Sequence, residues 1–87
     1  MIVKPWNKEI EKIFLQLQKN KRAFTHNVNI NRQIGRRCYE LIDNNYLDVS
    51  PPSHKKNRYW INVLPDTDIK IKSTRDKFIK FEFLKKL

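Results

Sequence analysis

The chain is poor in two residue types that mark common classes of protein. Its 87 residues include one cysteine, Cys38, and one glycine, Gly35. A single cysteine excludes an intramolecular disulfide, which fits a reducing, intracellular location. Because glycine is so scarce, the chain has neither a glycine-rich phosphate loop nor a flexible glycine-rich linker. These absences favour a small folded domain.

Long hydrophobic runs are also missing. No stretch approaches the roughly 20 apolar residues that cross a bilayer, and the N-terminal MIVKPWNKEIEK lacks the apolar run of a signal peptide. We therefore expect a soluble, cytoplasmic protein without a membrane partner.

Residues for catalysis or metal binding are equally sparse. The two histidines, His26 and His54, and Cys38 show no metal-ligand spacing, so we expect no metal and no other cofactor. Nothing near the three tyrosines suggests an activating base. A chain this small also has difficulty enclosing a substrate cleft. We expect a protein that is not an enzyme.

Acidic residues are outnumbered two to one. Nine Asp and Glu stand against nineteen Lys and Arg, for a net charge of +10. Such a field attracts polyanions, which are nucleic acid, an anionic membrane surface or an acidic protein. The excess is spread along the chain, so only local spacing can locate a binding face.

What the chain does have is apolar periodicity, which predicts an α+β fold. Residues 5–20 are expected to form an amphipathic helix with Pro5 in its first turn. Five apolar side chains share one face of it: Trp6, Ile10, Ile13, Phe14 and Leu17. A second helix is expected over residues 31–45, with Asn31 as N-cap and Asn44-Asn45 as its stop. Its buried stripe contains Ile34, Cys38, Leu41 and Ile42. Residues 23–29 fit a short strand, a turn or a stunted helix.

A β-hairpin is expected next, followed by a tail. Residues 46–50 and 59–64 are rich in strand formers, and they flank a polar tip over residues 53–58. Residues 68–72 alternate as a strand does. From Ser73 onward we favour a helix, although Phe81 and Phe83 alternate with charged residues as in a strand. The chain thus divides into a domain, 1–65, and a C-terminal extension, 66–87.

Part of the chain resembles a known family. The stretch NINRQIGRRCYELIDNNYLDVSPPSHKKNRYWINV, residues 29–63, resembles the recognition helix and wing of winged helix-turn-helix domains. The resemblance is to MarR-like regulators and to small phage and archaeal-virus proteins. It lies in the helix exit Leu41-Ile42-Asp43-Asn44-Asn45-Tyr46-Leu47, with Asn45 where the family has Gly, and in the basic loop before Asn57-Arg58-Tyr59-Trp60-Ile61. It implies helices packed with a small antiparallel hairpin, the wing. It also implies a helix of about two turns before the recognition helix, which residues 22–29 must supply.

The function that this resemblance implies is binding of double-stranded DNA. Arginine reads guanine and glutamine reads adenine, and arginine also holds phosphate. The candidate contacts on the helix are Asn31, Arg32, Gln33, Arg36, Arg37 and Tyr39, and at the hairpin tip they are His54, Lys55, Lys56 and Arg58. A solvated basic helix face is the simpler explanation of the arginines. The second acid-free basic cluster at the tip favours DNA. We expect a transcription regulator or replication accessory factor encoded by a phage, virus or plasmid.

Two further functions and one assembly stay open. The fold would also suit an adaptor that binds an acidic protein partner, and RNA binding is a third choice. The apolar tail residues are expected either to pair two copies as a homodimer or to pack onto the first helix. These residues are Phe78, Ile79, Phe83, Leu84 and Leu87.

Overall fold

The structure is a computed structural model that describes residues 1–51, 58–73 and 79–86. Its first helix, α1, spans Lys8–Asn20. It begins there because the Asn7 side chain accepts a hydrogen bond from the Ile10 backbone N–H at 2.8 Å. It ends at Lys21, whose left-handed backbone has φ 63°. Pro5 therefore precedes the helix and is not in its first turn, which corrects the predicted start.

The second helical region starts earlier than predicted and is interrupted. Helix α2 spans Val28–Arg37. The Asn27 side chain caps it by accepting hydrogen bonds from the backbone N–H groups of Asn29 and Ile30. Helix α3 spans Tyr39–Asp43, after an irregular backbone at Cys38. Asn31 thus lies inside α2 and is not its N-cap. The predicted stop is confirmed, because Asn45 adopts φ 62°.

The strands form two antiparallel sheets of three. The first sheet has the order β2-β4-β3, and the second has the order β1-β6-β5. The strand bounds are Ile2–Val3 (β1), Arg22–Thr25 (β2), Leu47–Val49 (β3), Tyr59–Val63 (β4), Thr67–Ser73 (β5) and Lys80–Lys85 (β6). The predicted hairpin is confirmed, as β3 pairs with β4. Residues 22–25 form a strand, so the helix of about two turns expected over 22–29 is absent and a winged helix-turn-helix is not confirmed.

The C-terminal segment corrects the prediction of a helix. Residues Lys80–Lys85 form strand β6, in which Phe81 and Phe83 are fully buried and alternate with Lys80 and Glu82. Both rings meet Phe14 of α1 edge-on, at centroid distances of 5.4 and 6.3 Å. Phe83 therefore packs within the molecule and is not available to pair two copies. Ile79 and Leu84 are half-buried, whereas Phe78 and Leu87 lie outside the described residues.

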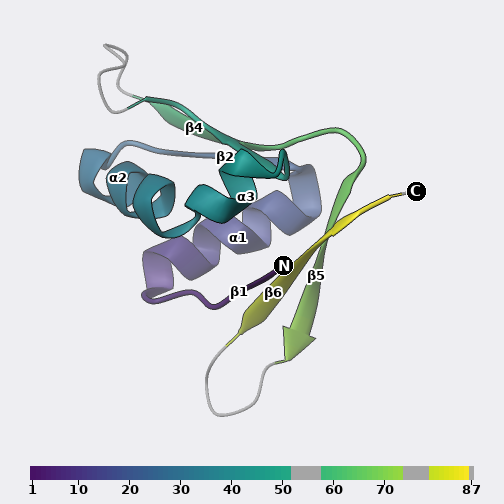
Figure 1. The fold of residues 1–87 in the computed structure, drawn as a ribbon. Helices are drawn as coiled ribbons and strands as arrows, with labels where there is room; N and C mark the ends of the chain where they lie inside the picture. The colour runs from purple at the N-terminus through teal and green to yellow at the C-terminus, as the bar shows by residue number, and fades with distance from the viewer. Residues whose placement is uncertain (52–57, 74–78, 87) are drawn as a thin grey trace.

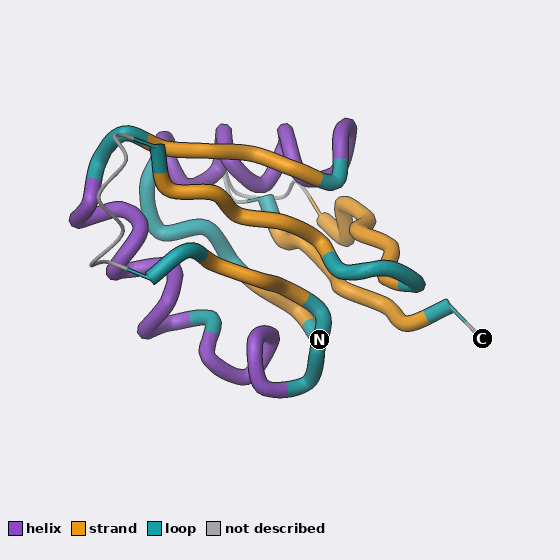
Figure 2. Tube along the Cα trace, turned by 90° about the horizontal axis from the view of Figure 1, so that it is seen from above, coloured by secondary structure: helices purple, strands orange, loops and turns teal. Residues whose placement is uncertain are grey.

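One hydrophobic core joins the two sheets. The helices lie on one side of the β2-β4-β3 sheet, and α1 also packs against β5 and β6 (Figures 1 and 2). The core residues with at most 1% exposure include Ile10, Phe14, Leu17, Ile34, Leu41, Leu47, Ile61, Phe81 and Phe83. Residues on both sides of position 65 therefore share this core. None of the helices in the described segments combines the length and apolarity of a transmembrane helix.

The end of α1 is tied to the second sheet by Lys21. Its Nζ donates to the Thr67 carbonyl oxygen at 2.5 Å and to Asp68 Oδ1 at 3.0 Å. Lys86 approaches the same carboxylate at 3.4 Å. The hydrogen bond from Lys21 is the main reason why the pKa of Asp68 lies below its ordinary value. These contacts set the second sheet against the helix end.

Candidate nucleic-acid interface

Helix α2 presents arginines on the surface opposite its core stripe. Ile30 and Ile34 are buried, whereas Arg32 and Arg36 are exposed. The two arginines are four residues apart, so they lie one above the other on the same face. Neither forms a hydrogen bond or ion pair with any residue in the described segments. The helix contains no acid, so the guanidinium groups of Arg32 and Arg36 are open to an anionic partner.

Arg37 and Gln33 are engaged with Trp6. The Trp6 indole N–H donates to Gln33 Oε1 at 3.1 Å, and the Arg37 guanidinium lies 5.0 Å from the centroid of the same ring. Bidentate reading of adenine uses both the oxygen and the nitrogen of a glutamine amide. Gln33 would have to release Trp6 to make that contact. These two side chains hold the N-terminal segment against α2.

Arg32 and Arg36 border a hollow between α2 and the end of β3. Its volume is about 320 Å³, and Gly35, Val49 and Pro51 contribute to its walls. A Cβ added at Gly35 would meet nothing within 4 Å. The space outside α2 is therefore open, and a ligand can come close to the helix backbone there.

Asn31 lies in the interior and not on the predicted DNA face. Its side chain is 1% exposed, and its Nδ2 donates to the Ser50 carbonyl oxygen at 2.9 Å. That bond ties α2 to the residue that follows β3. Its Oδ1 has no hydrogen-bond partner among the described residues. We leave Asn31 out of the interface because a DNA duplex cannot reach a side chain buried to this extent.

The remaining predicted contacts are spread over three places. Tyr39 is 57% exposed on α3, and its hydroxyl donates to Glu40 Oε1 at 3.3 Å. Arg58 immediately precedes β4, with its guanidinium 5.2 Å from the Phe24 ring centroid. The other three tip residues, His54, Lys55 and Lys56, lie outside the described residues. The structure thus brings Arg32 and Arg36 together, and it places Arg58 beside the first sheet.

Sequence reasoning missed a second group of surface residues on the β2-β4-β3 sheet. Arg22 lies with its guanidinium 3.8 Å from the Trp60 ring centroid, and Phe24 contacts Trp60 at 5.2 Å between centroids. The sequence pattern that indicates this surface is the alternation of Arg22, Ala23, Phe24 and Thr25. It does not settle the prediction, because residues 23–29 fit a strand, a turn and a stunted helix.

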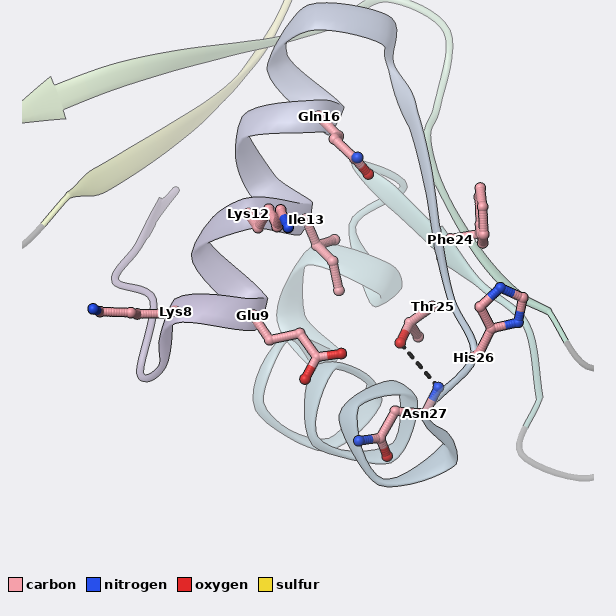
Figure 3. Close-up of a pocket in the computed structure, with 9 residues that line it drawn as sticks. All are labelled: Lys8, Glu9, Lys12, Ile13, Gln16, Phe24, Thr25, His26 and Asn27. Atoms are coloured by element: carbon pink, nitrogen blue, oxygen red, sulfur yellow. Dashed lines mark hydrogen bonds between the residues drawn. The ribbon is translucent and has the colours of Figure 1, made fainter.

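The hollow in Figure 3 lies between α1 and β2. It has a volume of about 700 Å³. Figure 3 shows Ile13 and Thr25 inside it, whereas Phe24 and His26 lie on the far side of β2 from α1. Its charged residues are Lys8, Lys12 and Glu9. The hollow therefore has a mainly basic border.

Cys38 and the acidic residues do not form a reactive or metal-binding centre in the described segments. Cys38 is 2% exposed, and burial raises the pKa of its thiol to about 12. At neutral pH the thiol is therefore protonated and weakly nucleophilic. Over residues 1–51, 58–73 and 79–86, no three His, Cys, Asp or Glu side chains gather as metal ligands would.

Comparisons with known proteins leave the family of the chain open. No family model matches it, and neither a curated protein nor a solved structure does. The function of the protein is therefore inferred from its own residues.

Proposed function

We propose that the protein binds double-stranded DNA through the arginine face of α2. The observation that carries this proposal is the pair Arg32 and Arg36, exposed one turn apart on a helix without acids. Guanidinium groups without a protein partner are suited to phosphate oxygens and to the O6 and N7 atoms of guanine. Bound in this way, the protein would act as a non-enzymatic transcription regulator or replication accessory factor.

The order of elements supports a winged-helix mode of binding. Helix α1, strand β2, the helical region α2–α3 and the hairpin β3–β4 follow one another. A helical region followed by a hairpin is the order that the family resemblance implies, whereas β2 stands where the resemblance implies a further helix. In this proposal α2 takes the place of the recognition helix, and Arg32 in its first half enters the major groove. The hairpin β3–β4 takes the place of the wing.

The net charge of +10 supports the same partner. Each phosphate contact releases condensed counterions, so affinity for a duplex falls steeply as salt rises. A winged-helix adaptor that binds an acidic protein would also carry this positive charge. That function does not explain why two arginines lie together beside an open helix surface. The salt dependence and the residues responsible for it separate the two functions.

The test removes both arginines and compares duplex binding by fluorescence anisotropy over a range of salt concentrations. We expect Arg32→Ala/Arg36→Ala to weaken binding at least about tenfold and to reduce the log–log salt slope by about 2, one for each lost phosphate contact. The matched control is Lys70→Ala/Lys80→Ala, which removes the same charge from exposed positions on the second sheet. It should lose much less affinity.

Two results would overturn the proposal. One is that the wild-type protein binds no duplex even at low salt. The other is that the Lys70 and Lys80 control loses as much affinity as the arginine variant, which would mean that binding follows net charge and not the α2 face. If Arg36 reads a base, Arg36→Ala should also relax the preference at one position of a bound sequence.

A further inference from the structure

The outer face of the β2-β4-β3 sheet carries an exposed row of aromatic and arginine side chains. Strand alternation buries Ala23 and Thr25 and turns Arg22 and Phe24 outward. The register places Phe24 opposite Trp60 on the neighbouring strand β4. All three helices lie on the other side of this sheet (Figures 1 and 2), so no described helix covers the row.

We call this row the aromatic ladder, and it consists of Arg58, Phe24, Trp60 and Arg22. The Arg58 guanidinium lies 5.2 Å from the Phe24 centroid, and the Phe24 and Trp60 centroids are 5.2 Å apart at an interplanar angle of 58°. The Arg22 guanidinium then lies 3.8 Å from the Trp60 centroid. Two aromatic rings are thus held between two cations, and Phe24 remains 40% exposed.

We propose that the aromatic ladder binds single-stranded nucleic acid by stacking unpaired bases. Phenylalanine, tryptophan and arginine planes all stack on nucleobases, and stacking of this kind tolerates any base because each has a π face. Phe24 offers an exposed ring, and Arg22 offers the outer plane of its guanidinium above Trp60. Both arginines can then meet the phosphates that flank the stacked bases.

Charge on and beside the ladder favours this occupant. The acid on this face in the described segments is Asp48, which lies on β3 opposite Asn62, in the same cross-strand row as Arg22 and not in that of Phe24 and Trp60. The hollow of Figure 3 lies at the free edge of β2 and is lined by Lys8, Lys12 and the single acid Glu9, with the Lys8 side chain pointing away from β2. A polyanionic strand that leaves Phe24 over this edge therefore continues along a mainly basic surface.

The ladder also has a purely structural interpretation. Cross-strand aromatic pairs and cation–π contacts stabilise sheets without any ligand. The two interpretations differ at Phe24, since stacking needs an aromatic ring whereas cross-strand packing accepts an aliphatic side chain. The proposed site shares no residue with the α2 face, so it goes beyond the proposed duplex binding and can fail or succeed separately from it.

The experiment titrates the 87-residue protein with labelled 15-nucleotide dT and rU strands and follows anisotropy. We expect Phe24→Ala and Phe24→Leu to weaken strand binding at least about fivefold, the loss of one stacked base, and Phe24→Trp to retain it. The matched control is Ile71→Ala, because Ile71 is also 40% exposed but lies on the second sheet. None of the three Phe24 variants should change duplex binding.

A fluorescence measurement reports directly on the ladder. Trp6 and Trp60 are the two tryptophans of the chain, so Trp6→Phe leaves Trp60 as the single emitter. Bases that enter the ladder should change its emission on addition of the dT strand, and a structural role alone would not.

The proposal is overturned if the wild-type protein binds neither strand, if Phe24→Leu binds as the wild type does, or if Ile71→Ala loses as much as Phe24→Ala. Binding of either strand that depends on the Phe24 ring supports it, and a preference between dT and rU assigns the natural strand to DNA or RNA. Because the ladder shares no residue with the α2 face, the variant that lacks Arg32 and Arg36 should keep strand binding. The two proposals therefore fail in different measurements.

Discussion

Cys38 sits between α2 and α3 with 2% of its surface exposed. Desolvation raises the pKa of its thiol from 9.0 to about 12. The folded protein therefore keeps this proton between pH 9 and 12, whereas the unfolded chain releases it. Stability is unaffected by the thiol below pH 9 and falls as the pH rises above it.

This pH dependence is a prediction about one residue. Between pH 9 and 11 the free energy of unfolding of the wild type should fall by about 1 kcal/mol per pH unit relative to Cys38→Ala. Urea denaturation of both proteins at several pH values measures the difference, and the subtraction cancels the other groups that titrate there. Parallel pH profiles would show that the thiol is accessible in the folded protein. Alkylation by iodoacetamide at pH 8 should likewise be slow until the protein unfolds.

At the scale of the elements, asparagines and one lysine set the helix boundaries. Asn7 and Asn27 cap the two longer helices, and Asn45 ends the α3 region at φ 62°. In a chain with a single glycine, asparagine takes the left-handed position because it tolerates that conformation better than other side chains. The lone glycine, Gly35, is inside α2, where no positive φ is needed.

The strain at Asn45 can be tested by substitution. We expect Asn45→Ala to lower the free energy of unfolding by about 1 kcal/mol and Asn45→Gly to leave it unchanged or raise it slightly. The neighbouring control is Asn44, which has φ −94°, and there glycine should destabilise. Thermal and urea denaturation give both numbers. If alanine at position 45 were harmless, the left-handed turn would not be what ends the helix.

The elements between residues 22 and 63 show where local sequence patterns were sufficient to predict the structure. The hairpin was predicted because strand formers flank a polar tip, and β3 and β4 lie there. The start of α2 was misjudged, since Asn27 and Asn31 are equally good caps in isolation. Tertiary contacts choose between them: β2 carries the chain to Asn27 in an extended form, and the Thr25 hydroxyl accepts from the Asn27 N–H at 3.1 Å.

For the molecule as a whole, the C-terminal segment is part of the core. Strand β6 lies between β1 and β5, and the N-terminal ammonium of Met1 donates to the Phe83 carbonyl oxygen at 2.8 Å. An 87-residue chain buries only a small hydrophobic core, so each core residue matters to its stability. The two phenylalanines of β6 are therefore expected to contribute a large share of its stability.

We expect Phe83→Ala to lower the free energy of unfolding by about 3–5 kcal/mol, as for other fully buried phenylalanines. Leu84→Ala on the same strand should cost less, because Leu84 is only half-buried. Urea denaturation measures both changes, and light scattering reports the mass. If Phe83→Ala kept its stability and changed only the mass of a dimer, the core position of Phe83 would be wrong.

The sequence by itself determined the α+β class, the amphipathic first helix, the hairpin and the positive charge, because these follow from local spacing and composition. It did not determine whether residues 80–85 are helix or strand. Phe83 fits both a helical apolar stripe and a strand alternation, whereas Phe81 fits the alternation alone, and the pairing with β1 and β5 over Phe14 selects the strand. The tertiary structure also decided that Asn31 is buried and that Arg22, Phe24, Trp60 and Arg58 share one surface. These relations join residues that are distant in the chain, and no local pattern encodes such distances.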